Sequence, residues 1–241
     1  MDSKVFKRKS YLLLVLVVLA TLGLLGTAYL TRDVVLFESL PQAINKHIVY
    51  QSITLLAVFV FLRLLKSFKE EAFCTYFRKG NTAASVIPVP QVGIKPKPNE
   101  NWSHIGTSFS VVISVITAIV IYFQVVKVEG FSIEKMIYVL PFSLLFALSN
   151  SFVEECITRL GVIVALDGLK SATTTQLVSA LIFGLAHYFG NPGGPVGVLV
   201  AGFLGWLLAK SIMETKGIFW AWGIHFLQDV IIMTALFSMS S

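Results

Sequence analysis

The chain has 241 residues, of which 56% are hydrophobic and 13% are charged, and its mean hydropathy is +0.80. A soluble domain usually has about 25% charged residues, so this composition excludes an ordinary soluble domain and indicates an integral membrane protein. The net charge of +6 comes from lysines and arginines beside apolar runs, as expected from membrane topology and contact with lipid headgroups. We therefore expect no nucleic-acid partner.

The first part of the chain predicts three membrane helices and one long polar connection. A basic segment at residues 4–9 precedes an apolar run from Tyr11 to Tyr29. This run is longer than the apolar region of a typical signal peptide and no A-x-A cleavage site follows, so we expect a retained helix. Further apolar runs lie at about 48–65 and 107–126. Residues 67–105 between them are rich in proline and glycine toward their end and predict an extended cytosolic loop.

The second part of the chain predicts four more apolar helices. They lie at about 137–166, 174–189, 195–213 and 217–238, and the turn GNPGGP at 190–195 separates two of them. All are near the length of about 20 residues that crosses a bilayer, although the run at 174–189 is short. The two cysteines, Cys74 and Cys156, suggest neither a disulfide framework nor a zinc knuckle.

The charge distribution predicts the orientation of these helices. With a cytosolic N-terminus, fifteen lysines and arginines fall on the cytosolic side and four on the other side, namely Arg32, Lys46, Lys127 and Lys135. This is a strong positive-inside bias. The expected fold is an all-α, polytopic membrane helix bundle of about seven transmembrane helices with a cytosolic N-terminus. We expect residues 1–130 to form N-terminal transmembrane helices with the cytosolic loop 67–105, and residues 131–241 to form a second helical domain.

Ionisable residues inside apolar helices are costly and therefore candidates for function. In the stretch SNSFVEECITRLG, Glu155 and Arg159 are four residues apart and can pair on one helix face, which leaves Glu154 without a local cation. Alternatively, both glutamates lie at the membrane surface where the helix ends. Cys156 falls on a different face from Glu154 and is expected to pack in the helix interface.

Two further polar clusters follow on later helices. Phe183 and His187 share one face of FGLAH, and His225 and Asp229 share one face of HFLQD. Considered alone, His187 is more typical of a residue near a helix end at the membrane interface. The His225–Asp229 pair, considered alone, could serve only to fix the packing of helices. Taken together with the glutamates, these groups could satisfy one another at membrane depth and supply acid, base and hydrogen-bond donors in one place. By contrast, His47 and His104 lie beside polar loop residues and are expected at the surface.

The three motifs resemble those of the CPBP family, the CAAX-processing and bacteriocin-immunity intramembrane proteases also called the Abi family. That family carries EExxxR, FxxxH and HxxxN or HxxxD in this order, and the resemblance covers roughly residues 137–237. It implies an endopeptidase with a membrane-embedded cavity open toward the cytosol, and it makes 131–241 a CPBP-like domain. It also implies six candidate catalytic residues, namely Glu154, Glu155, Arg159, His187, His225 and Asp229.

The resemblance also implies roles for these residues. Glu154 would be the general base that activates a water, and His187 would help to hold that water. His225 and residue 229 would stabilise the oxyanion, while the Glu155–Arg159 pair would orient the helix or the substrate. Well-described members carry asparagine where this chain has Asp229, and an ionised carboxylate would repel an oxyanion. We therefore expect Asp229 to orient His225, whose imidazolium is the donor.

The expected chemistry needs no cofactor, although zinc is possible. If a metal is present, its ligands would be Glu154, His187 and His225, but HExxH is absent from the sequence. The expected partners are a membrane-associated peptide or protein substrate and the lipid bilayer, and in a bacterium the location would be the plasma membrane. The alternative is a non-catalytic bacteriocin-immunity or regulatory membrane scaffold protein. A proton-coupled transporter is a third possibility, but we find no inverted repeat that would support it.

Overall fold

The computed structural model describes residues 3–239 and is an all-α bundle, as the sequence predicts. Six helical segments in this range are long and apolar enough to cross a membrane. They are α1 (Ser3–Leu30), α2 (Gln42–Phe68), α4 (Trp102–Ile121) continued by a π-helical turn and α5 (Lys127–Glu129), α6 (Ile133–Glu154) continued to α7 (Gly161–Leu166), α9 (Gly194–Thr215) and α10 (Phe219–Phe237).

The seventh predicted helix exists but is shorter than a membrane span. It is α8 (Ala172–Ala186), which has only 15 residues. The Ser171 side chain caps its first turn by accepting a hydrogen bond from the backbone N–H of Thr174 over 3.2 Å. A 3₁₀ turn, His187–Phe189, ends the helix before the Gly- and Pro-rich turn. The prediction of about seven spanning helices is therefore not confirmed, since the described residues contain six candidate spans and one shorter helix.

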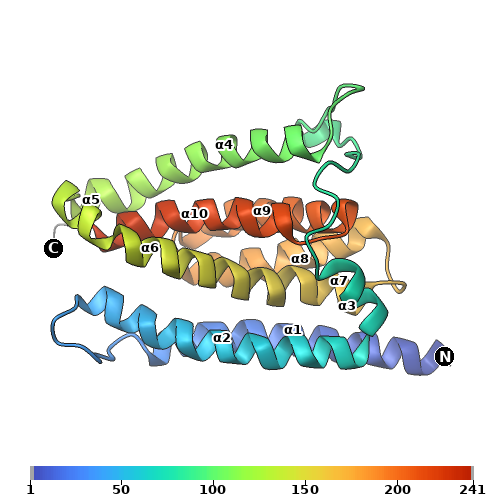
Figure 1. Cartoon of the computed structure of the whole chain (residues 1–241), viewed down its shortest axis with the longest axis horizontal. Helices are drawn as coiled ribbons and strands as arrows, with labels where there is room; N and C mark the ends of the chain where they lie inside the picture. The colour runs from blue at the N-terminus through green and yellow to red at the C-terminus, as the bar shows by residue number, and fades with distance from the viewer. Residues whose placement is uncertain (1–2, 240–241) are drawn as a thin grey trace.

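The bundle has a layered arrangement (Figure 1). The α1–α2 hairpin lies on one side, α4 lies on the other, and α6, α8, α9 and α10 lie between them. Helix α10 packs against α4, α6 and α9, and α8 packs against α9. Gly184 permits the close contact of α8 with α9, because a Cβ atom there would lie 2.8 Å from the carbonyl oxygen of Val198. This contact places the end of α8 beside the middle of the bundle.

The loops gather at the two ends of the bundle. We call the end that is rich in lysine and arginine the basic end, and the other end the opposite end. The basic end contains the start of α1, residues 69–101, the turn 167–171 and the turn 216–218. The opposite end contains the loop 31–41, the turn 130–132 and the end of α10. At this opposite end the backbone N–H of Ser132 donates to the carbonyl of Ser238 over 2.9 Å. Whether the basic end is cytosolic stays a prediction.

The segment predicted as an extended loop is instead packed against the basic end. It contains α3 (Glu70–Tyr76) and the 3₁₀ turn Pro90–Val92. The side chains of Ile94 and Trp102 are completely buried, and Trp220 Nε1 donates to the carbonyl of Thr82 over 2.9 Å. Apolar residues scattered between prolines have no helical period, so the sequence pattern did not reveal this packing.

Candidate active site

The first motif lies where α6 changes to a π-helical turn, Glu155–Leu160. Such turns insert one extra residue per turn and occur often at functional sites. Every residue of this turn is buried, including Cys156, which packs in the core as expected. Arg159 Nε lies 3.3 Å from Glu155 Oε1, and both side chains are essentially inaccessible to solvent. The predicted Glu155–Arg159 pair is therefore present, and both side chains lie in the protein interior.

His225 on α10 lies among three carboxylates. Its Nδ1 donates to Glu155 Oε1 over 2.7 Å, and its Nε2 lies 3.6 Å from Glu154 Oε2 and 3.5 Å from Asp229 Oδ1. The shortest contact thus comes from Glu155, whereas the sequence had suggested Asp229 as the group that orients the imidazole. The physical reason is non-local, since the packing of α10 on α6 brings a residue 70 positions away closer than the one on the next turn.

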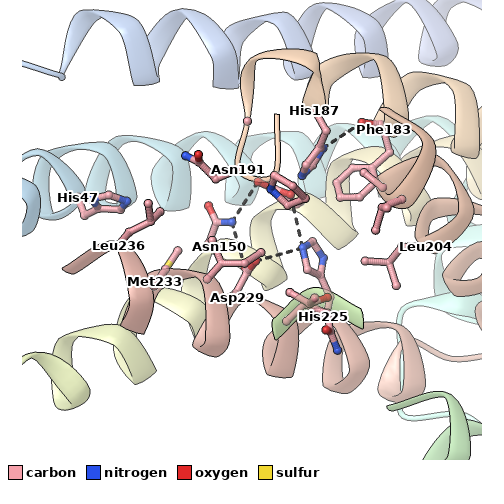
Figure 2. Close-up of a pocket in the computed structure, with 18 residues that line it drawn as sticks. His47, Asn150, Phe183, His187, Asn191, Leu204, His225, Asp229, Met233 and Leu236 are labelled. Carbon is pink, nitrogen blue, oxygen red and sulfur yellow. Dashed lines mark hydrogen bonds and ion pairs between the residues drawn. The ribbon is translucent and has the colours of Figure 1, made fainter. Parts of the chain in front are cut away.

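Asn150 is a residue of this cluster that sequence analysis missed. Its side-chain amide donates to Glu154 Oε1 and to Asp229 Oδ2, both over 3.0 Å (Figure 2). Gln51 Nε2 on α2 donates to Asn150 Oδ1 over 3.3 Å, which directs the amide N–H groups toward the two carboxylates. Asn150 lies one helical turn before Glu154 in an apolar helix, and that position was the available signal.

The second motif contributes an aromatic ring that connects the charged groups. The Phe183 ring lies with its centroid 3.4 Å from the Arg159 guanidinium carbon and 4.1 and 5.5 Å from the ring centroids of His187 and His225. A guanidinium over an aromatic face is stabilised by the ring quadrupole. His187 Nδ1 donates to the Phe183 carbonyl over 3.0 Å. This bond leaves the other imidazole nitrogen available as an acceptor.

A cavity of about 180 Å³ adjoins these groups, and it extends toward the opposite end of the bundle. Glu154, His187, His225 and Asp229 line this cavity together with Asn191 and Leu236, and Figure 2 labels all of these residues except Glu154. Two neighbouring cavities reach between α1, α2 and the end of α8, and all three share His47 as a lining residue. One Glu154 oxygen, Oε2, is buried without a hydrogen-bond partner.

His47 is not the surface residue that its neighbours in sequence suggested. Its ring packs against Phe146 and Phe237 with centroid distances of 5.8 and 4.9 Å, and its Nδ1 donates to the Ala43 carbonyl over 2.7 Å. The polar residues around it belong to the first turn of α2, which packs inward against α6 and α10 rather than facing solvent. His104, by contrast, is exposed as expected and takes part in the cap of α4.

The donor groups of the cluster do not fit the metal site considered as an alternative. Among residues 3–239, no three histidines, cysteines, aspartates or glutamates lie so that they could hold a metal ion. Both ring nitrogens of His225 face carboxylates, and Nδ1 of His187 is bonded to a backbone carbonyl. We therefore derive no step of the reaction through a metal.

The comparisons with known proteins concern the segment that carries this cluster. Residues 136–231 match the family described as type II CAAX prenyl endopeptidase Rce1-like. No curated protein and no solved structure matches the chain. The matched segment contains all six candidate residues, and it confirms the family resemblance stated from the three motifs. The family and the six apolar helices together indicate a multi-pass integral membrane protein.

Proposed function

We propose that this member of the CAAX protease family is an intramembrane endopeptidase that hydrolyses membrane-associated substrates with a water activated by Glu154. The observation that carries the proposal is the environment of the Glu154 carboxylate. Asn150 holds one of its oxygens, whereas the other is buried without a hydrogen-bond partner beside the cavity. A carboxylate with a free lone pair at a water-sized space is the geometry that a general base requires.

The charges of the cluster support proton uptake at this position. Three carboxylates, on Glu154, Glu155 and Asp229, face at most two cations, on Arg159 and His225. One negative charge is therefore left over in a site that is largely excluded from water. Buried charges without a partner are costly, so Glu154 is favoured to accept a proton from water, and the negative charge then moves to the hydroxide that attacks the substrate.

The remaining steps follow from the donors that face the cavity. The hydroxide attacks the carbonyl carbon, and the charge that develops on the carbonyl oxygen is stabilised by the N–H of His225 that points away from Glu155. His187, whose Nδ1 is occupied by the Phe183 carbonyl, accepts a hydrogen bond from the attacking water through its other nitrogen. The protonated Glu154 then donates its proton to the amine as the C–N bond breaks, which returns the site to its starting state.

This proposal assigns Asp229 and Asn150 supporting roles. Asp229 lies beside the same nitrogen of His225 that would face the oxyanion, so its charge favours an imidazolium there. Asn150 neutralises part of the repulsion between Glu154 and Asp229 by donating to both. The reaction as proposed requires no metal, and activity that survives extensive treatment with a chelator is the expected result.

The test compares Glu154→Gln with Glu129→Gln, which changes an exposed glutamate at the opposite end. Each purified variant in lipid vesicles receives two fluorogenic peptides, one prenylated and one amphipathic without a lipid. Loss of the general base should lower the rate by about 10²- to 10⁴-fold, whereas the control should match the wild type. His187→Ala should also lower the rate. Undiminished cleavage by Glu154→Gln would refute the mechanism.

The same variants separate catalysis from the alternative function. An immunity or scaffold protein acts by binding, so its cellular effect should survive both Glu154→Gln and His187→Ala as long as the protein folds. An endopeptidase loses its effect with either change. Unfolding temperatures measured in the same detergent identify any variant whose effect is lost through misfolding.

A further inference from the structure

One face of α2 adjoins the catalytic cluster, although α2 lies outside the segment that matches the protease family. The match covers residues 136–231, whereas α2 spans Gln42–Phe68. His47, Tyr50 and Gln51 are three and four residues apart on this helix, so they lie on neighbouring positions of one face. Gln51 holds Asn150 from this face, but the proposed reaction gives no role to the other two side chains.

Two cavities lie along this face of α2, and both are lined by His47 and Tyr50. One has a volume of about 250 Å³ and is also lined by Glu154 and His187, which line the catalytic cavity as well. The other has a volume of about 340 Å³ and shares His47 with the catalytic cavity. A peptide chain with one bond at Glu154 therefore has space to continue past both side chains of α2.

His47 and Tyr50 each carry one polar atom that has no partner. His47 Nδ1 donates to the Ala43 carbonyl over 2.7 Å, which leaves Nε2 as an acceptor. The rings of Phe146 and Phe237 pack against the imidazole and restrict its orientation. Within residues 3–239, no hydrogen bond joins His47 Nε2 or the Tyr50 hydroxyl to another group. The two cavities thus offer one acceptor and one donor side by side on a single helix.

We propose that His47 and Tyr50 form a subsite for the backbone of the peptide substrate. The Tyr50 hydroxyl donates to a carbonyl oxygen of the peptide, and His47 Nε2 accepts from a peptide N–H. Each residue of a peptide backbone has one such acceptor and, except for proline, one such donor, whereas a lipid chain has neither. The contacts would set the register of the bound chain without selecting its side chains. This inference rests on the proposed function for the identity of the ligand as a peptide.

The first test measures binding without cleavage, in the Glu154→Gln background. The probes are the prenylated and the amphipathic peptides of the cleavage assay, and their Kd is measured by fluorescence anisotropy in lipid nanodiscs. Loss of one neutral hydrogen bond corresponds to about a 2- to 12-fold rise in Kd, which is the result expected for Tyr50→Phe and for His47→Phe. Tyr138→Phe is the matched control, because Tyr138 is exposed on α6 and lines none of the three cavities.

The second test separates a direct contact from an effect on the fold, because His47→Phe also removes the bond to the Ala43 carbonyl. A series of peptides carries a methyl group on one backbone nitrogen at a time, which removes one N–H donor from each. Methylation at one position should raise the Kd for the Glu154→Gln protein, and the same methylation should cause no further rise after His47→Phe. A structural role for His47 would instead raise the Kd of every peptide in the series by the same factor.

The outcomes distinguish this inference from the proposed function. If both variants weaken binding but the wild type cleaves no peptide, the subsite stands and the endopeptidase proposal fails. If the wild type cleaves and neither Tyr50→Phe nor His47→Phe changes Kd or KM, the subsite is wrong and the endopeptidase proposal stands. Binding of the prenylated peptide alone, without any effect of these variants or of N-methylation, would assign the cavities to a lipid chain and overturn the inference.

Discussion

Asn150 offers the most informative perturbation of the site, because it donates to two carboxylates at once. In Asn150→Leu the side chain keeps a similar volume and loses both hydrogen bonds of 3.0 Å, to Glu154 and to Asp229. We expect the maximal rate of cleavage to fall, because Glu154 loses the group that orients it. Asn150 lines the cavity beside the two carboxylates, and as a positioning residue it should affect the maximal rate more than KM.

The magnitude follows from the number and type of bonds. A hydrogen bond to a charged group contributes about 1.5 to 3 kcal/mol. Only the bond to Glu154 acts directly on the proposed base, so we assign the effect on the barrier to one bond. At about 1.4 kcal/mol for each factor of ten, the maximal rate should fall by about 10- to 150-fold.

The assay measures kcat and KM for peptide cleavage in lipid vesicles, together with the unfolding temperature. Ser149→Ala is the matched control, because Ser149 precedes Asn150 and bonds only to carbonyls of its own helix. Gln51→Leu, which removes the bond to Asn150 Oδ1, should lower kcat less than Asn150→Leu does. A wild-type kcat in Asn150→Leu, or a loss confined to KM and unfolding temperature, would refute the positioning role.

Three further perturbations test charge placement in the structure. Arg159→Met removes the cation beside the buried Glu155, so unfolding should become easier by about 3 to 5 kcal/mol; a change below about 1 kcal/mol by denaturant titration would contradict the buried pair. Lys210→Met should be destabilising by a similar amount, since it leaves the buried carboxylate of Glu214 without its cation. The double variant with Glu214→Gln, which removes the charge but keeps an acceptor for Trp102 Nε1, should recover most of the loss. Burial and the charge of Asp167 raise the pKa of Tyr76, which lies outside the spanning helices. Its stabilising contribution is therefore complete below about pH 10, the pKa of an unperturbed tyrosine, and falls at higher pH. The difference in unfolding temperature between wild type and Tyr76→Phe should therefore shrink as the pH rises from about 10 to 12. A difference that stays constant over this range would show that Tyr76 does not titrate differently in the folded protein.

Several features of the chain are readable from local patterns alone. Long apolar runs predicted the membrane bundle, because hydropathy and span length depend only on neighbouring residues. The spacing of four between Glu155 and Arg159, and between His225 and Asp229, predicted pairs that the structure contains as ion pairs. The order of the three motifs also indicated the family that residues 136–231 match.

Other features depend on which helix faces meet. The 2.7 Å contact between His225 and Glu155 and the link from Gln51 to Asn150 join residues 70 and 99 positions apart. No periodicity encodes such distances, since they arise from the packing of α6 against α10 and α2. The inward position of His47 has the same origin, because a polar residue in a first helical turn is exposed or buried according to the helices beside it.

The sequence by itself thus determined that the chain is a membrane helix bundle and which ionisable groups are candidates for chemistry. Only the tertiary structure decided that Glu155 rather than Asp229 makes the shortest contact to His225, that Asn150 belongs to the cluster, and that the cavity leads away from the basic end. The physical reason is that patterns of charge and hydropathy are properties of residues near one another in the chain, so they can be read from the sequence. The direction of a cavity is set instead by side chains from six different helices, and it exists only once they have packed.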